Sequence, residues 1–129
     1  MSNTWGKLIG FGFGFWVILA FSLSPVMAQD VEKIYKKRCE KCHGVEGKGD
    51  GKTLVKMNRK AKKKGKKEVI ASDWSDKAAM AKLTDEYLLD IIVKGGKKLK
   101  KSKRMPSYKK KLSAEEAKAL ADYVRTFAK

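Results

Sequence analysis

Cysteine and histidine are scarce in this sequence. Their scarcity argues against a small domain held together by disulfide bonds and against one built around a structural zinc ion. The 129 residues include two cysteines and one histidine. The cysteines, Cys39 and Cys42, are too close in sequence for a disulfide that staples a fold together. A structural zinc site is disfavoured as well, because zinc usually takes four protein ligands and the chain offers only these two thiols and His43.

Acidic residues are missing from the first 28 positions. Residues 1–28 contain one base, Lys7, then a long apolar run and finally Ser24-Pro25-Val26-Met27-Ala28. This pattern is typical of a secretory signal peptide that is cut after Ala28. An uncleaved membrane anchor is the alternative, because a span needs about 20 apolar residues. Under either hypothesis residues 29–129 form one domain on the far side of the membrane, and we expect the protein in the periplasm.

What the chain does contain is the run Cys39-Glu40-Lys41-Cys42-His43. A Cys-x-x-Cys-His run is the attachment signature of a c-type haem, with two thiols for thioether bonds and an imidazole for the iron. Residues three and four apart share one helix face, so the three side chains can address one flat ligand. A thioredoxin-like redox pair is the competing hypothesis, but no alternating pattern of strands and helices surrounds the motif. The motif therefore predicts one covalently bound haem c, with its iron on His43.

Large apolar residues are few outside the first 28 positions, and 35% of the whole chain is charged. Domains this small and this charged commonly need a metal or a cofactor for stability. A buried haem would meet that need, so we expect the chain to fold poorly without it.

Apolar spacing and capping residues predict three helices. The first covers residues 30–42, where apolar side chains recur every three or four positions and lead into the motif. The second begins at Thr84 as N-cap and ends before Gly95-Gly96. The third begins at Ser113-Ala114-Glu115-Glu116, a capping box, and continues to the C-terminus.

The segments between these helices are rich in glycine or in lysine. Residues 44–51 contain four glycines, which predicts tight turns. Residues 52–67 hold nine basic residues and no acid, which predicts a solvated loop or at best a short exposed helix. The pattern of residues 69–81 is mixed and predicts no element.

Five short motifs, in this order, make the chain resemble a class I cytochrome c. They are Cys39-Glu40-Lys41-Cys42-His43-Gly44, Gly47-Lys48-Gly49-Asp50-Gly51, Ile92-Val93-Lys94-Gly95-Gly96, Met105-Pro106-Ser107-Tyr108, and Leu112-Ser113-Ala114-Glu115-Glu116 with the helix after it. The resemblance covers most of residues 30–129. It implies an all-α cytochrome c fold, with three to five helices around one haem. It also implies that the first and last helices cross, with Tyr35 and Tyr123 near the crossing.

The second axial ligand decides between two functions. A filled sixth position makes the iron a one-electron shuttle, whereas an open one lets it bind a small molecule. The candidates are Met57, Met80, Met105 and, at high pH, the lysines, and composition cannot choose among them. The resemblance implies Met105, which Pro106 follows shortly before the last helix. A methionine is more often core filler, and we assign that role first to Met80 and second to Met57. We therefore predict an electron carrier rather than an enzyme; the alternative is a haem-binding subunit or gas sensor with a displaceable or absent sixth ligand.

Two aromatic residues are further candidates for contact with the haem. The resemblance implies that Trp74 donates its indole N–H to a haem propionate, and the alternative is a partly buried aromatic without that role. Tyr108 is expected to pack beside Met105, with its hydroxyl at the surface. In the family a proline carbonyl commonly accepts the N–H of the haem histidine, but the loop after His43 has no proline, so the sequence names no acceptor.

The charge distribution predicts the kind of partner. Residues 94–111 form a second acid-free stretch, with ten basic residues, and the whole chain has a formal net charge of +17. Basic residues around a haem edge would guide acidic redox partners, such as a reductase and an oxidase-like acceptor, to this site. Nucleic acid is disfavoured because aromatic residues are not interleaved with the lysines. Plain solvation and contact with anionic lipid are the alternatives, and we expect a monomer.

Overall fold

Helices account for all regular structure in residues 25–129, which are the residues that the computed structural model describes. They are α1 (Pro25–Arg38), α2 (Glu40–His43), α3 (Lys52–Lys63), α4 (Lys77–Ala81), α5 (Asp85–Lys94) and α6 (Ala114–Arg125). The predicted all-α class is confirmed, although these residues contain more helices than the three to five expected. The predicted signal peptide or anchor lies outside the described residues, except for its last four positions.

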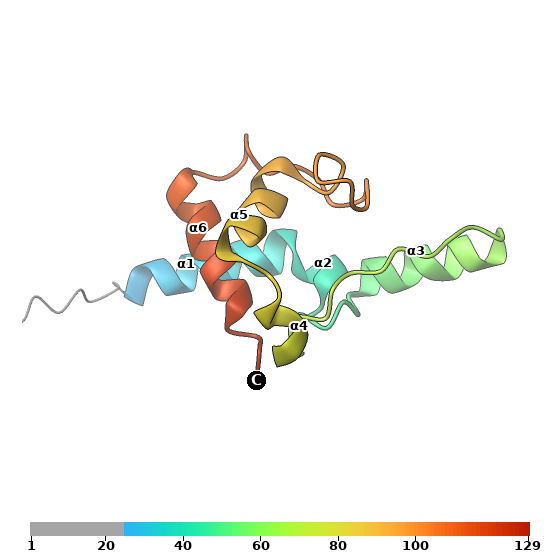
Figure 1. The fold of residues 1–129 in the computed structure, drawn as a ribbon, viewed down its shortest axis with the longest axis horizontal. Coiled ribbons are helices and arrows are strands. Elements are labelled where there is room, and N and C mark those ends of the chain that lie inside the picture. The colour runs from blue at the N-terminus through green and yellow to red at the C-terminus, as the bar shows by residue number, and fades with distance from the viewer. Residues whose placement is uncertain (1–24) are drawn as a thin grey trace, which may run out of the picture.

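Helices α1 and α6 cross, and α5 packs against α6 beside them (Figure 1). The Tyr35 and Tyr123 rings meet at this crossing with their centroids 5.4 Å apart, which confirms the expected placement of these two residues. Tyr35 is also among the largest fully buried side chains, together with Leu88 of α5 and Leu120 of α6. The crossing therefore forms one wall of the core.

The caps of α5 and α6 lie where the sequence predicts them. The Thr84 hydroxyl accepts a hydrogen bond from the backbone N–H of Tyr87 and begins α5. Ser113 and Glu116 form the predicted capping box of α6. Helix α6 ends at Arg125, short of the C-terminus, and the Arg125 guanidinium donates to the Leu83 carbonyl at 2.5 Å. This bond ties the end of α6 to the beginning of α5.

The predicted first helix is divided at Cys39. A continuous helix would join the N–H of Cys42 to the carbonyl of Arg38, but this N–H instead bonds to the Cys39 carbonyl at 3.0 Å. The loop after the motif crosses α2 closely at Gly51, where a Cβ atom would lie 2.5 Å from the Lys41 carbonyl carbon. The break and this close approach set the position of α2, which carries most of the motif.

Residues 52–67 form more structure than the sequence predicts. Helix α3 has 12 residues and projects away from the body of the protein (Figure 1). The Asn58 side chain holds the returning chain, because its amide accepts from the Val69 N–H at 2.9 Å and donates to the Val69 carbonyl at 2.8 Å. We call residues 59–68, beyond this clamp, the basic arm.

No helix within residues 25–129 has both the length and the apolar character needed to cross a lipid bilayer.

Candidate functional site

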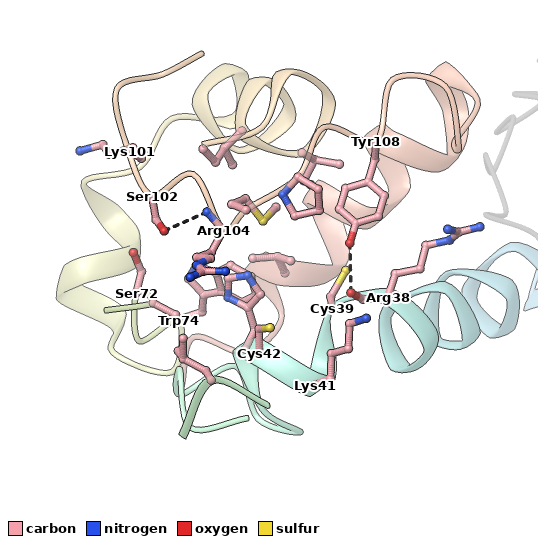
Figure 2. A pocket seen from close by; sticks show the side chains of 18 of the residues that line it. Arg38, Cys39, Lys41, Cys42, Ser72, Trp74, Lys101, Ser102, Arg104 and Tyr108 are labelled. Carbon is pink, nitrogen blue, oxygen red and sulfur yellow. Dashed lines mark hydrogen bonds between the residues drawn. The ribbon is translucent and has the colours of Figure 1, made fainter. Parts of the chain in front are cut away.

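A cavity of about 750 Å³ brings together the five residues that the sequence predicts will contact the haem (Figure 2). Cys39, Cys42, His43, Trp74 and Met105 all line it. Most of the other lining residues are apolar, and α5 and α6 supply five aliphatic ones: Leu88, Ile91, Ile92, Leu120 and Val124. Its volume lies within the range of about 300–1,000 Å³ that small-molecule and cofactor sites occupy.

The motif presents two free thiols and one imidazole to this cavity. Cys39 and Cys42 are both half-buried and free. Burial raises the pKa of the Cys39 thiol to about 11, so this thiol is protonated at neutral pH. Burial also lowers the pKa of His43 to about 4, which keeps the imidazole in the neutral form that binds metals.

The two nitrogens of the His43 ring have different surroundings. Nδ1 is buried and has no hydrogen-bond partner among the described residues. Nε2 also makes no hydrogen bond within residues 25–129, but it is not among the buried atoms, so it is the ring nitrogen that keeps access to the cavity lined by His43. This lack of a partner agrees with the absence of a proline from the loop after His43. In the family a proline carbonyl of that loop commonly accepts the N–H of the haem histidine, and here no backbone carbonyl of the described residues takes its place.

Trp74 stacks on the His43 ring, a contact that the sequence does not predict. The two ring centroids are 4.2 Å apart and the ring planes differ by 13°. Trp74 is itself held by its backbone N–H, which donates to the Gly47 carbonyl at 2.8 Å, and its ring lies nearly parallel to that of Phe127, with the centroids 6.5 Å apart. None of the hydrogen bonds found in residues 25–129 uses the indole N–H of Trp74.

Met105 reaches the cavity from a segment that lies along the end of α5. The N–H of Gly96 donates to the Met105 carbonyl at 2.9 Å, and the N–H of Tyr108 donates to the Ile92 carbonyl at 3.1 Å. Only a glycine fits at position 95, because a Cβ there would lie 2.7 Å from the Ser107 nitrogen. The Gly95-Gly96 pair therefore does more than end the helix: it lets the Met105 segment lie against it.

The other two methionines differ in their surroundings. Met80 is 3% exposed and belongs to the apolar core, which confirms its role as core filler. Met57 is half-buried and lines the cavity. Met57 is therefore the methionine that remains as an alternative to Met105 for the sixth ligand of the iron.

The Tyr108 hydroxyl is not at the surface, so that expectation is wrong. Tyr108 is 7% exposed, and its hydroxyl donates to the backbone carbonyl of Arg38 at 3.1 Å. The expectation failed because the acceptor is remote in sequence, and no local pattern records it.

The residues around this cavity fit a haem. The wall has two thiols, a neutral imidazole and the thioethers of Met57 and Met105, and most of the remaining lining residues are apolar. Ile70 is 87% exposed and lines the cavity, which is explained if a bound apolar group covers it. Among the described residues no three His, Cys, Asp or Glu side chains gather as a metal cluster.

Comparison with known proteins agrees with this fit. Residues 26–124 match the family described as cytochrome c oxidase, cbb3-type, subunit III. Among solved structures, the chain is similar to one described as KustC0563 c-type cytochrome. The two are 31% identical, the match covers 76% of this chain and 96% of that chain, and the TM-score is 0.55. This chain is a class I c-type cytochrome. The comparison with curated proteins found no match.

As a c-type cytochrome, the protein carries covalently bound haem c with its iron. Membership also supports a role in electron transfer rather than catalysis, and redox partners in general. The cytochrome c fold accounts for the arrangement described above, in which α1 and α6 cross beside the cavity.

Proposed function

We propose that this cytochrome is a periplasmic one-electron carrier whose haem iron is ligated by His43 and Met105. The observation that carries the proposal is that both side chains line one cavity, although they belong to different segments of the chain. When bound, the haem supplies a single iron that cycles between the ferric and ferrous states. A thioether ligand such as that of Met105 favours the ferrous state and raises the reduction potential, which suits a carrier.

The other cavity residues have supporting roles in this proposal. Cys39 and Cys42 hold the haem as thioethers, so that it does not dissociate. The apolar side chains of α5 and α6 exclude water from the iron. Trp74 has an indole N–H that no protein group uses in the described residues, and we assign it to a propionate, as the resemblance to the family implies.

Optical spectra of the purified protein test the ligation. We expect the weak near-red band of methionine bound to ferric iron, and little response of the ferrous form to carbon monoxide. High-spin features together with ready binding of carbon monoxide would instead identify a gas sensor or haem-binding subunit with an open sixth position.

We further propose that the carrier binds acidic redox partners at the cavity. Six basic residues and no acidic residue line it: Lys37, Arg38, Lys41, Lys101, Arg104 and Lys111. None of the ion pairs found in residues 25–129 involves one of these six or a residue of the basic arm. These unpaired charges line the cavity that would hold the haem, so they would favour fast, salt-sensitive encounters with an acidic surface.

Charge reversal at the cavity should slow electron transfer to an acidic partner. We expect Lys101→Glu/Arg104→Glu to lower the rate of electron transfer to a small blue-copper protein of net negative charge by about tenfold at low salt. The control is Lys33→Glu/Lys118→Glu, which changes the net charge equally at exposed positions outside the cavity. Stopped-flow rates measured against ionic strength give the comparison. Equal slowing of both variants, or a rate independent of salt, would rule out docking at this site.

The proposed export has a structural corollary. Cleavage after Ala28 falls inside α1, which begins at Pro25, so we expect the signal peptidase to act before this helix folds. The intact mass of the protein recovered from the periplasm should correspond to residues 29–129 with haem. A mass that includes residues 1–28 would support the uncleaved anchor.

A further inference from the structure

The break between α1 and α2 leaves one backbone carbonyl without its helical partner, and the hydroxyl of a tyrosine remote in sequence donates a hydrogen bond to it. The Arg38 carbonyl has lost its helical partner, because the N–H of Cys42 bonds to Cys39 instead. The Tyr108 hydroxyl donates to this carbonyl at 3.1 Å, across 70 positions of sequence (Figure 2). An end carbonyl of a helix needs such a partner when it is shielded from water.

Tyr108 also belongs to the segment that carries Met105. Its backbone N–H is bonded to Ile92, so Tyr108 is held to α5 by its backbone and to α1 by its hydroxyl. Among the hydrogen bonds of the described residues, this hydroxyl makes the only one that joins residues 94–112 to α1 or α2. The ring lines the cavity between these two attachments.

We propose that Tyr108 is a positioning residue for Met105. Its hydroxyl ties the segment that carries Met105 to Arg38, the residue before Cys39. This bond keeps the wall of the cavity that bears Met105 in place against the wall that bears the attachment motif. The inference rests on the proposed function, in which Met105 is the sixth ligand. Opening of the segment to displace Met105 must break this hydrogen bond, and it leaves a partly buried carbonyl without a partner.

The test is displacement of Met105 by imidazole in the ferric holoprotein. Tyr108→Phe keeps the ring and removes only the hydroxyl. We expect the apparent affinity for imidazole, followed through the near-red band, to rise about two- to tenfold, as a net hydrogen-bond contribution of about 0.5–1.5 kcal/mol implies. The matched control is Tyr87→Phe, because Tyr87 also lines the cavity and its hydroxyl makes no hydrogen bond within the described residues.

The outcomes separate three cases. A rise in imidazole affinity for Tyr108→Phe that exceeds the rise for Tyr87→Phe supports the inference. A lower denaturation midpoint with unchanged imidazole affinity would show that the bond only stabilises the fold, and it would overturn the inference. If the wild-type protein lacks the near-red band and binds imidazole as readily as Met105→Leu, the proposed function fails, and the inference fails with it.

Discussion

The Cys39→Ala/Cys42→Ala variant should lose its cooperative unfolding transition. The cavity of about 750 Å³ lies among the few buried apolar side chains of this domain. Interiors of folded proteins are close-packed, so a core with such a void has lost the contacts that stabilise it. We expect the loss to exceed about 5 kcal/mol, which is the whole stability of a marginal domain.

Thermal melting followed by far-ultraviolet circular dichroism measures this effect, with absorption spectra to verify that haem is absent. Lys41→Ala is the matched control, because Lys41 lies between the two cysteines and its side chain forms none of the predicted haem bonds. This variant should keep covalent haem and a cooperative transition. Native-like circular dichroism and cooperative melting of the double variant without haem would show that the chain folds by itself, against our expectation.

Met105→Leu should lower the reduction potential by on the order of 0.2 V, a fraction of the roughly 0.8 V over which axial ligands tune haem proteins. Leucine has nearly the volume of methionine, so the packing cost is expected to stay below about 1.5 kcal/mol. The thioether that favours ferrous iron is lost, however. The near-red band should disappear, and the ferrous form should bind carbon monoxide.

Met57→Leu is the control for this experiment, because Met57 lines the same cavity. Redox titration and optical spectra of both variants identify the ligand. If Met57→Leu removes the band and Met105→Leu keeps it, Met57 is the sixth ligand and our assignment is wrong. If both variants keep wild-type spectra and potential, neither methionine binds the iron.

The sequence by itself was sufficient for features that depend on neighbouring residues. The caps at Thr84 and Ser113 depend on side chains that bond within one helical turn, and both are present as predicted. The attachment motif also lies within five consecutive residues. Such features are local, so residue spacing alone records them.

Where lysines dominate a segment, a short apolar face is easily missed, as with Leu54, Met57 and Ala61 at helical spacing. Residues 52–67 read as a loop or a short helix because lysines dominate them, yet α3 forms over 12 residues. The Asn58 amide clamps the returning chain at Val69, and Leu54 is buried. These tertiary contacts outweigh the repulsion between neighbouring lysines.

The haem-attachment motif was determined by five consecutive residues, but its surroundings were decided by the tertiary structure. Two contacts could not be predicted from local pattern: the stack of Trp74 on His43 and the bond from Tyr108 to Arg38. Both join residues that are far apart in sequence. The break at Cys39 could not be predicted either, because the Arg38 carbonyl that it frees has its partner 70 positions away. Hydrophobic periodicity records which face of a helix is buried, whereas the partner buried against that face depends on how the whole chain folds.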